Sequence, residues 1–459
     1  MKQFKKSLFI FRRDLRLHDN TGLIEALKIS EEVLPSFIFD SQQLENNPFR
    51  GENCVQFMVE SLTDLDDQLK EKAGRLYLFY GNTKAIIRAL IKEHGIDAVF
   101  VNHDYTPYSI HRDLNIKNEC ETNHIVFKDY PDYLLNEPYD VLRDDGGVYS
   151  VYTPFKNKSM DNEVRKPVDN LYTNYYTKPV AEEAGDDIFS KVLPVENENI
   201  FIHGGRNNGL KILKEIARYK NYDTERDIPS IPGTTGLSAH HKFGTLSIRE
   251  VYYAVCEKLG KIHTLIKQLY WRDFFVHVGY HYPEVLGNAF HEKYNRIKWR
   301  QDEADFKAWC EGRTGFPIVD AGMRELNTTG FMHNRVRMVT ASLLVKDLQI
   351  DWRWGEKYFA QKLIDYDPFV NNGNWQWVAS TGCDVQPYFR VFNPWRQQER
   401  FDPECKYIKK WIPELKDLTP QEIHQWSGGA GSLFAPNYPP PMVDHARESE
   451  KIKEIFKKL

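Results

Sequence analysis

Tryptophan is missing from the first half of the chain: ten are present among 459 residues, and none precedes Trp271. A membrane-spanning helix, which needs roughly 18 consecutive apolar residues, is not indicated anywhere. The apolar run near the N-terminus covers only residues 8–11, too short for the apolar region of a signal peptide. We therefore expect no membrane partner and an intracellular location, cytoplasmic or, in a eukaryotic host, nuclear.

Metal-binding and hydrolytic motifs are absent as well. The six cysteines are scattered, without a C-x-x-C pair or a Cys/His cluster, so they are expected to be reduced core residues. No Walker loop, H-E-x-x-H motif or Ser-His-Asp order stands out. The sequence therefore predicts neither a metal site nor a hydrolytic nucleophile.

The bulk composition is that of a globular protein, with 41% hydrophobic and 27% charged residues. At 459 residues the chain is long enough for two or three domains. Its net charge of −4 argues weakly against a polyanionic partner. Residues 371–400, however, contain three arginines and only two acids, and this local excess permits such a partner.

Apolar runs and helical patterns alternate in the first 130 residues. The runs are expected to be buried strands, and they cover residues 7–11, 33–39, 75–80, 97–102 and 124–127. Five strands with intervening helices predict a doubly wound parallel sheet, a Rossmann-like α/β domain at 1–130. Ligands of such sheets bind at the carboxyl ends of the strands, where residues 12–20 follow the first strand without a G-x-G-x-x-G motif. The alternative for this segment is a solvated loop with internal salt bridges.

The pattern changes twice after the α/β domain. Residues 131–202 are rich in proline, tyrosine, asparagine and acidic side chains, and they predict a long interdomain connector that wraps over the surface. From residue 203 to 459 apolar residues recur at three-to-four spacing, which predicts an all-helical domain. No internal repeat is present, and a charged helix is expected to end the chain.

Two tryptophans lie two positions apart in the segment NNGNWQWVAS. Two positions subtend about 200° around an α-helix, so Trp375 and Trp377 are expected to face opposite ways, one into the domain and the other into a cleft. Core filling by both rings is the simpler alternative, because tryptophan is usually highly buried. Their polar neighbours Asp365 and Asn371 need partners if they are buried. A bound polar ligand would satisfy them, and so, for Asp365, would an ion pair with Arg337.

Three further segments carry polar or aromatic groups at close spacing. Residues 231–247 are dense in hydroxyls and glycines ahead of a helix, which suits phosphate binding at the helix N-terminus but also an ordinary capped loop. Gln268 and Trp271 form an i, i+3 pair on a predicted helix, and Asn334 and Met338 form an i, i+4 pair. Tryptophans, arginines and polar groups without a nucleophile favour redox or photochemistry supplied by a cofactor.

Long and specific motifs recur over nearly the whole chain. They include FIFRRDLRLHDN, TTGLSAHHKFGTLS, YWRDFF, TGFPIVDAGMRELNTTGFMHNRVRMVTASLLVKDL, WGEKYFAQKLIDYDPFVNNGNWQWVASTGCD and PYFRVFNPW. In this combination they resemble the photolyase/cryptochrome family, and most closely its class I cyclobutane pyrimidine dimer DNA photolyases. The resemblance implies an α/β antenna domain and an all-helical FAD-binding domain. The implied activity is light-driven repair of cyclobutane pyrimidine dimers by electron transfer from excited FADH⁻ to a flipped-out dimer.

The resemblance assigns the cofactor and electron-transfer residues. The family's flavin contacts fall on Tyr222, Thr234, Thr235, Gly236, Leu237, Ser238, Asn334, Arg337, Asp365, Asp367 and Asn371. Asn371 takes the position that faces flavin N5, where photolyases carry asparagine, plant cryptochromes aspartate and animal cryptochromes cysteine. Trp375 begins an electron relay that continues through Trp352 to Trp299 near the surface.

The resemblance also assigns DNA-binding residues. Trp377 and Trp271 are implied to be the two walls against which a flipped-out dimer packs. Asn334 and Met338 favour cyclobutane dimers, because (6-4) photolyases carry two histidines at these positions. Gln268 is a departure, since photolyases of this class usually have a glutamate that binds the dimer. DNA phosphates are implied to contact Arg226, Arg272, Arg335 and Arg390, for which ordinary surface ion pairing is the alternative.

The antenna chromophore is left open among deazaflavin, flavin and folate. Tyr108 and Ser109 stand where folate-binding members place an Asn-Glu pair, so the segment is more similar to members that use a deazaflavin or a flavin, or no antenna. The implied partner is DNA that carries pyrimidine dimers, bound by a monomer. Two rival functions are a blue-light photoreceptor of the cryptochrome type, which Gln268 favours, and a (6-4) photolyase.

Overall fold

The computed structural model describes residues 2–459 with the exception of 46, 186, 386 and 427–436. The chain divides into two compact units. Unit 1 consists of Met1–Asn197, Ile202–Arg218 and Gly236–Pro283, and unit 2 of Glu198–Phe201, Tyr219–Thr235 and Glu284–Leu459. The domain ranges predicted from the sequence, 1–130, 131–202 and 203–459, stay predictions.

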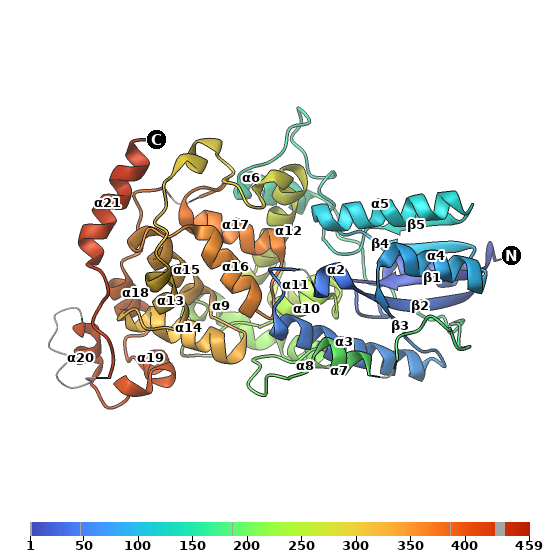
Figure 1. Ribbon diagram of the computed structural model, residues 1–459, viewed down its shortest axis with the longest axis horizontal. Coiled ribbons are helices and arrows are strands. Elements are labelled where there is room, and N and C mark those ends of the chain that lie inside the picture. The colour runs from blue at the N-terminus through green and yellow to red at the C-terminus, as the bar shows by residue number, and fades with distance from the viewer. Residues whose placement is uncertain (1, 46, 186, 386, 427–436) are drawn as a thin grey trace. The chain divides into compact units, whose positions relative to one another are not determined.

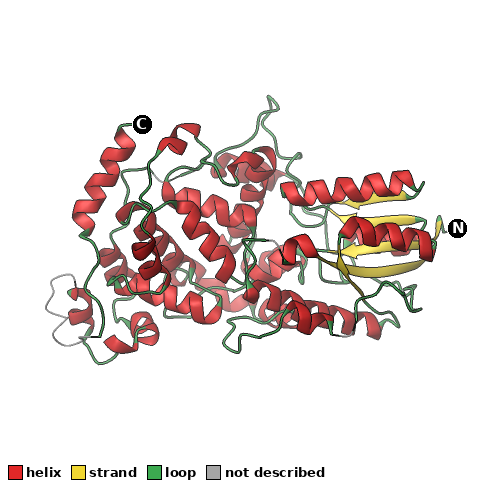
Figure 2. Ribbon diagram, in the orientation of Figure 1, coloured by secondary structure: helices red, strands yellow, loops and turns green. Residues whose placement is uncertain are grey.

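A five-stranded parallel sheet forms the centre of unit 1, drawn as yellow arrows in Figure 2. Its strands lie in the order β3-β2-β1-β4-β5, and each neighbouring pair is parallel. The bounds are β1 (Phe4–Phe11), β2 (Ser30–Asp40), β3 (Tyr77–Gly81), β4 (Ala98–Asn102) and β5 (Val126–Tyr130). The predicted doubly wound α/β fold is confirmed, and each predicted apolar run overlaps one of these strands.

Helices cover the sheet of unit 1. Helices α4 (Thr83–His94) and α5 (Pro107–Thr122) pack against each other (Figure 1), while α1 (Thr21–Ile29) packs against the sheet itself. The side chains of Asn82, Thr106 and Asn20 cap these three helices by accepting a backbone N–H three residues on. The other helices of unit 1 are α2 (Ser41–Leu44), α3 (Glu52–Glu71), α6 (Tyr152–Asp161), α7 (Ile188–Val192), α8 (Arg206–Lys214), α10 (Ser238–Phe243), α11 (Ile248–Leu259) and α12 (Thr264–His281).

The predicted connector, residues 131–202, is attached to the sheet by its backbone. The N–H of Val33 on β2 donates to the carbonyl of Asn174 at 3.0 Å, and the N–H of Tyr176 donates back to the carbonyl of Val33 at 2.8 Å. The hydroxyl of Tyr77 on β3 donates to the carbonyl of Lys178 at 2.8 Å. The segment therefore runs beside β2, and it also contributes helices α6 and α7 to unit 1.

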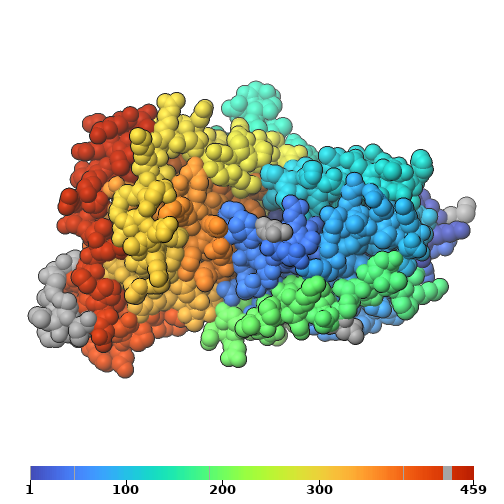
Figure 3. Space-filling model, viewed as in Figure 1, coloured from blue at the N-terminus to red at the C-terminus, as the bar shows by residue number. Residues whose placement is uncertain are grey.

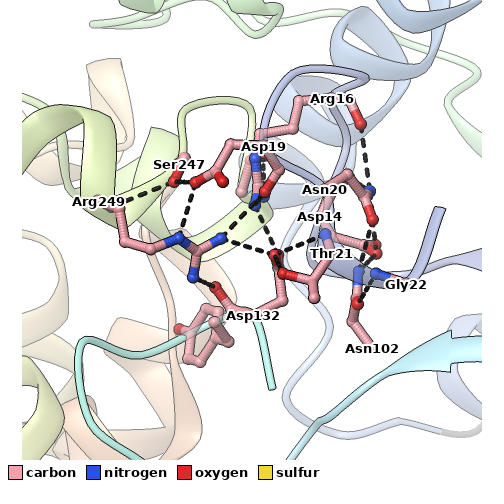
Figure 4. Close-up of polar contacts among 12 residues, drawn as sticks. Asp14, Arg16, Asp19, Asn20, Thr21, Gly22, Asn102, Asp132, Ser247 and Arg249 are labelled. Carbon is pink, nitrogen blue, oxygen red and sulfur yellow. Dashed lines mark hydrogen bonds and ion pairs between the residues drawn. The ribbon is translucent and has the colours of Figure 1, made fainter. Parts of the chain in front are cut away.

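Buried charges join three distant segments of unit 1, as Figure 4 shows. Asp132 accepts hydrogen bonds from Arg16 at 2.6 Å and from Arg249 at 2.8 Å, and Arg249 also donates to Asp19 at 2.7 Å. All four side chains are 6% exposed or less. Burial alone would raise the pKa of Asp132, but the charges of Arg16 and Arg249 outweigh it and hold that pKa well below its usual range. These salt bridges of the 12–20 segment are therefore internal and buried, not solvated.

A second set of polar contacts, also drawn in Figure 4, joins the end of β4 to the segment that follows β1. Asn102, the last residue of β4, donates to Asp14 at 2.5 Å and to Asn20 at 2.8 Å, and it accepts the N–H of Gly22 at 2.8 Å. A Cβ at Gly22 would lie 2.7 Å from the side-chain oxygen of Asn102. Glycine is therefore required where α1 begins against the carboxyl end of β4.

The named elements of unit 2 in the described part of the chain are helical, which confirms the predicted all-helical region. Its main core contains the four tryptophans Trp309, Trp352, Trp375 and Trp426. The helices are α9 (Tyr222–Glu225), η3 (Glu292–Arg296), α13 (Glu303–Cys310), α14 (Pro317–Thr329), α15 (Asn334–Ser342), η4 (Leu343–Asp347), α16 (Trp352–Lys362), α17 (Pro368–Ala379), α18 (Pro394–Phe401), α19 (Lys406–Trp411), η5 (Pro413–Leu415), α20 (Pro420–His424) and α21 (His445–Lys457).

The predicted charged helix at the end of the chain is α21, red in Figures 1 and 3, where it lies at the surface of unit 2. It packs on η4, a π-helical turn into which α15 continues. His445 hydrogen-bonds to the buried Asp347 at 2.5 Å, and the ammonium of Lys346 lies 4.2 Å from the centre of the Phe456 ring. The π turn lets two consecutive charged residues, Lys346 and Asp347, both face the interior.

Removing Arg249 is expected to destabilise unit 1, because Asp19 and Asp132 would each lose a buried cationic partner. We expect Arg249→Met to lower the free energy of unfolding by about 3–5 kcal/mol. Arg165 pairs with the same Asp19 but is 44% exposed, so Arg165→Met should cost only about 0–1 kcal/mol. Urea unfolding followed by circular dichroism measures both, and equal losses would contradict the dependence on burial.

Candidate functional site

Helix α17 carries the two neighbouring tryptophans. The carboxylate of Asp367 caps it by accepting the N–H groups of Phe369 at 3.0 Å and Val370 at 3.1 Å, with Pro368 in its first turn. Trp375 is 2% exposed, whereas Trp377 is only partly buried. The different burial of the two indoles agrees with the opposite orientations expected from their spacing.

Trp375 belongs to a continuous aromatic core. Its ring packs edge-on against Phe359, with 4.9 Å between the ring centres, and Trp352 lies in the same core cluster. A Cβ on Gly355 would lie 2.2 Å from the Trp375 ring, so this glycine allows α16 to approach α17. Trp299 is partly buried and packs both on this core and on the smaller apolar cluster beneath α21. The three tryptophans predicted as a relay thus extend from the interior of unit 2 toward α21.

A buried amide and carboxyl network also joins α17 to α16. Asn371 donates to the backbone carbonyl of Glu356 at 3.0 Å, and Asn372 donates to the side chain of Glu356 at 3.0 Å. Gln376 donates to the side-chain oxygen of Asn372 at 2.9 Å. Burial raises the pKa of Glu356 to about 7. The hydrogen bond from its N–H₂ group to the carbonyl of Glu356 therefore holds the carboxamide of Asn371 in one orientation.

Arg337 and Asp365 form the ion pair that the sequence suggested. Two hydrogen bonds of 3.2 Å join them, and Arg337 also donates to the carbonyl of Met332 at 2.7 Å. Their side chains are 23% and 12% exposed. The pair lies between α15 and the loop before α17, so it positions Asp365, two residues before the Asp367 cap of the tryptophan helix.

Asn334 and Met338 lie on α15, where the Asn334 amide donates to the Met338 sulfur at 3.7 Å. His333 caps this helix by accepting the N–H of Arg335 at 3.2 Å, and burial lowers the pKa of His333 to about 4, so the ring is neutral. Arg335 forms an ion pair with Asp227 at 2.9 Å and lies 4.3 Å from the Phe401 ring centre. Asp227, which follows Arg226 in the sequence, thus forms its ion pair with Arg335.

The hydroxyl-rich segment follows a short helix in unit 2 and continues into unit 1. Tyr222, at the start of α9, is buried, with the guanidinium of Arg226 located 5.6 Å from its ring centre. Thr234 and Thr235 are half-buried, and Gly236 has a positive φ of 69° that favours glycine. Leu237 is buried, and the exposed Ser238 begins α10.

Helix α12 of unit 1 carries Gln268, Trp271 and Arg272. Trp271 stacks face to face on Tyr152 of α6, with 3.6 Å between ring centres and 9° between planes. Arg272 donates to the carbonyl of Tyr133 at 3.0 Å and lies 3.6 Å above the centre of that ring. Arg272 is therefore engaged within unit 1, while Gln268 is half-buried on the same helix.

Charged side chains gather where β1 and β4 end. Arg12 forms an ion pair with Asp113, and Arg13 forms one with Asp104 at 3.3 Å. Asp104 also accepts from the hydroxyl of Ser109 at 2.7 Å. Burial would raise the pKa of Asp104, but the neighbouring arginines, led by Arg13, hold it well below its usual range. This is the edge at which a doubly wound sheet binds its ligands.

Sequence reasoning missed several residues of these arrangements. Glu356 and Tyr152 were not singled out, although each touches a predicted site residue. Asn372 and Gln376 are four positions apart on the same helix, and that polar i, i+4 pair inside an apolar helix was an available signal. Nothing in the local sequence indicated Tyr152, because its partner lies on another helix.

The residues that the structure describes give no group of His, Cys, Asp and Glu side chains suited to a metal ion. In the same residues no helix combines the length and the apolar character needed to cross a bilayer.

Comparison with known proteins gives consistent matches over both units. Residues 7–171 match the family model of DNA photolyase, and residues 265–458 match that of the FAD binding domain of DNA photolyase. The deoxyribodipyrimidine photo-lyase of Alkalihalophilus pseudofirmus is 35% identical over 97% of either chain. A photolyase from Sulfolobus tokodaii, solved with two FAD molecules, is 43% identical with a TM-score of 0.90 over 99% of this chain and 100% of that one. A cryptochrome from Synechocystis is 29% identical, with a TM-score of 0.89 over 99% and 100% of the two chains.

Glu356→Gln is expected to stabilise unit 2 above neutral pH. Burial raises the pKa of Glu356 from 4.5 to about 7. The protonated carboxyl therefore contributes stability that is complete below pH 4.5 and is lost as the pH rises through about 7. Glutamine does not ionise and so avoids this loss of stability. A pKa shift of this size corresponds to a loss of about 3 kcal/mol in the free energy of unfolding.

Urea unfolding of both proteins between about pH 5 and pH 8.5 measures the difference. The advantage of the variant should grow from the lower end of that window and level off above about pH 7. Glu303→Gln, at an exposed position on α13, is the matched control and should give a nearly constant difference. An effect of Glu356→Gln that does not change with pH would mean that the carboxyl is already ionised in the folded protein.

Proposed function

The chain belongs to the DNA photolyase family, and from that premise we propose that it is a light-driven lyase that splits cyclobutane pyrimidine dimers in DNA. The observation that carries this proposal is the identity of 35% over 97% of both chains with a deoxyribodipyrimidine photo-lyase. The side chains at Asn371, Asn334 and Met338 support it, since each is the type that such photolyases carry at the matching position. The compartment and the monomeric state stay predictions.

Several polar groups of unit 2 fit a bound flavin. A flavin ring presents carbonyl and N–H groups at its edge, and the guanidinium of Arg337, the carboxylate of Asp365 and the oriented carboxamide of Asn371 are complementary to them. When bound and reduced, FAD supplies the excited electron that splits the dimer. Residues that would hold it are Tyr222, Thr234, Thr235, Gly236, Leu237, Ser238, Asn334, Arg337, Asp365, Asp367 and Asn371.

The Arg337–Asp365 pair and Asn371 would orient and polarise the ring rather than react with it. Arg337 is held by Asp365 and by the carbonyl of Met332, so its charge stays in place when a ligand binds. Because the N–H₂ group of Asn371 donates to the backbone carbonyl of Glu356, its side-chain oxygen faces the opposite way. Such pre-oriented groups stabilise a charged ligand without having to reorganise.

Trp375, Trp352 and Trp299 would conduct an electron from the surface of unit 2 to its interior. Trp375 and Trp352 are both nearly fully buried, and Trp299 is partly buried beside α21. Their shared core excludes water from the path between the first two rings. Indole is more easily oxidised than the phenyl rings that pack against it, such as that of Phe359.

The DNA-contacting residues are assigned from the same family pattern. Gln268, Trp271, Asn334, Met338 and Trp377 would contact the dimer, and Arg226, Arg272, Arg335 and Arg390 the flanking phosphates. Two of these arginines already have partners: Arg335 pairs with Asp227, and Arg272 is bound to Tyr133. They would therefore offer their remaining N–H groups to phosphate from a fixed position.

We also infer a flavin as the antenna chromophore in unit 1. The Sulfolobus relative, 43% identical, is described with two FAD molecules and a novel light-harvesting cofactor. Arg12 and Arg13, at the carboxyl end of β1, suit an anionic diphosphate, and Tyr108 and Ser109 replace the pair that holds folate. More than one flavin per chain after purification would support this inference, and a bound folate would overturn it.

The rival functions use the same fold. The Synechocystis cryptochrome shares the fold at a TM-score of 0.89, so the fold does not distinguish a photoreceptor from a repair enzyme. Gln268 is the residue that favours the photoreceptor, because glutamine cannot share a proton with the dimer as the usual glutamate can. A (6-4) photolyase is disfavoured by Asn334 and Met338 in place of two histidines.

A repair assay tests the proposed function. Protein with its flavin chemically reduced is mixed with an oligonucleotide that carries one thymine cyclobutane dimer, and the absorbance at 260 nm is followed under blue light. A light-dependent gain in absorbance is expected, because splitting restores two thymine rings. Gln268→Glu should then raise the repair rate at saturating DNA. No gain by either protein would exclude repair of cyclobutane dimers and would favour a different lesion or the photoreceptor.

Trp352→Phe is expected to block the relay without affecting repair by reduced protein. In this variant the light-driven reduction of oxidised flavin should be at least about tenfold slower. An increase of ~1.4 kcal/mol in the barrier to electron transfer is enough for a tenfold lower rate. Trp354→Phe is the matched control on the same helix; its partly buried ring packs against Phe306, and reduction should keep its rate. Equal rates in the two variants would contradict the relay.

A further inference from the structure

Helix α6 places a tyrosine directly against a predicted substrate-binding tryptophan. The rings of Tyr152 and Trp271 are nearly parallel, at 9°, and their centres are 3.6 Å apart. Both residues belong to unit 1, and Tyr152 comes from the segment that the sequence predicted only as a connector. A face-to-face contact this close places the phenol ring over one face of the Trp271 indole.

The phenol is fixed at its far end as well. Its hydroxyl donates to the backbone carbonyl of Lys267 at 2.7 Å, one helical turn before Trp271 on α12. Tyr152 is 8% exposed, and burial raises the pKa of its hydroxyl above the usual value, so the group stays a neutral donor. The ring therefore cannot turn without losing both the stack and this hydrogen bond.

Two phenylalanines restrict the remaining sides of the indole. Phe274 meets Trp271 edge-on, with 5.7 Å between the ring centres and 82° between the planes, and Phe275 lies at 5.6 Å. Phe274 also packs edge-on against Tyr152. Trp271 is nevertheless only half-buried, so part of it stays accessible while its orientation is determined by three aromatic neighbours.

We propose that Tyr152 is a positioning residue for dimer recognition: it occupies one face of Trp271 and holds the indole so that the opposite face stacks on a pyrimidine ring. The proposal rests on the proposed function, in which Trp271 contacts the dimer. A wall that is already ordered loses less conformational entropy on binding than one that must be fixed by the ligand. Tyr152 thus raises affinity for the lesion without touching it.

The test compares binding of dimer-bearing and undamaged oligonucleotides to the flavin-loaded protein in the dark. Tyr152→Leu removes the stack and is expected to weaken dimer binding about threefold to tenfold, the range of an aromatic pair. Binding to undamaged duplex should not change. Tyr152→Phe keeps the stack and should restore dimer affinity to within about twofold, since the lost hydroxyl contact has a modest net value.

Phe155→Leu is the matched control for damage to α6. Phe155 lies on the same helix and packs against Phe274 at 5.3 Å and His277 at 4.9 Å. Its loss should lower the unfolding temperature about as much as Tyr152→Leu does, yet leave the preference for dimer-bearing DNA unchanged. An equal loss of preference in both variants would show that Tyr152 only stabilises the helix pair, and would overturn the proposal.

A double-mutant cycle with Trp271→Ala separates the two levels of the inference. If Tyr152 acts through Trp271, Tyr152→Leu should have no further effect on dimer binding once the indole is gone. Repair at saturating DNA by reduced protein should also be unchanged in Tyr152→Leu, so that only affinity falls. Full additivity would overturn the positioning role while leaving Trp271 a contact. An unchanged dimer affinity in Trp271→Ala alone would instead overturn the assigned contact, and the positioning role with it.

Discussion

The buried charges around Asp132 are the constraint on which unit 1 depends. Asp132 is separated by 116 residues from Arg16 and by 117 from Arg249, and Asp19 is 230 residues from Arg249. Leaving any one of these charges buried without its partner costs several kcal/mol. The loop after β1, the start of the connector and the first turn of α11 must therefore assemble together. This explains why α10, α11 and α12 belong to the same compact unit as the sheet.

The same assembly extends to the residues assigned to DNA. Tyr133 follows Asp132 directly, and its ring lies between two guanidinium groups, that of Arg272 at 3.6 Å and that of Arg13 at 4.0 Å. Arg272 is the next residue after Trp271 on α12. The salt-bridge network thus fixes Tyr133, Tyr133 fixes Arg272, and the helix that presents Trp271 is held at that point. The side chains assigned to the lesion are supported by contacts that themselves have no role in binding it.

The sequence predicted those features whose periodicity lies within one element. The five strands were visible as apolar runs, and the different surroundings of Trp375 and Trp377 follow from their spacing on one helix. The partners of Arg16 could not be inferred, because a salt bridge over more than a hundred residues leaves no local pattern. Helix α6 was missed because prolines, tyrosines and polar residues surround Tyr152, and these also suit a loop. The π turn at η4 continues the apolar spacing of α15, so the sequence showed one helix where the backbone changes its geometry.

The electrostatics of unit 2 follow from burial as much as from charge. Glu356 has a pKa raised to about 7 by burial, and His333 has one lowered to about 4. Between about pH 4 and about pH 7 both groups are therefore uncharged, and Arg337 is balanced by Asp365. An ionised Glu356 carboxylate close to Asn371 would repel an anionic flavin ring, whereas the protonated carboxyl does not. The residues that position Asn371 can thus be polar and buried without adding net charge to the site.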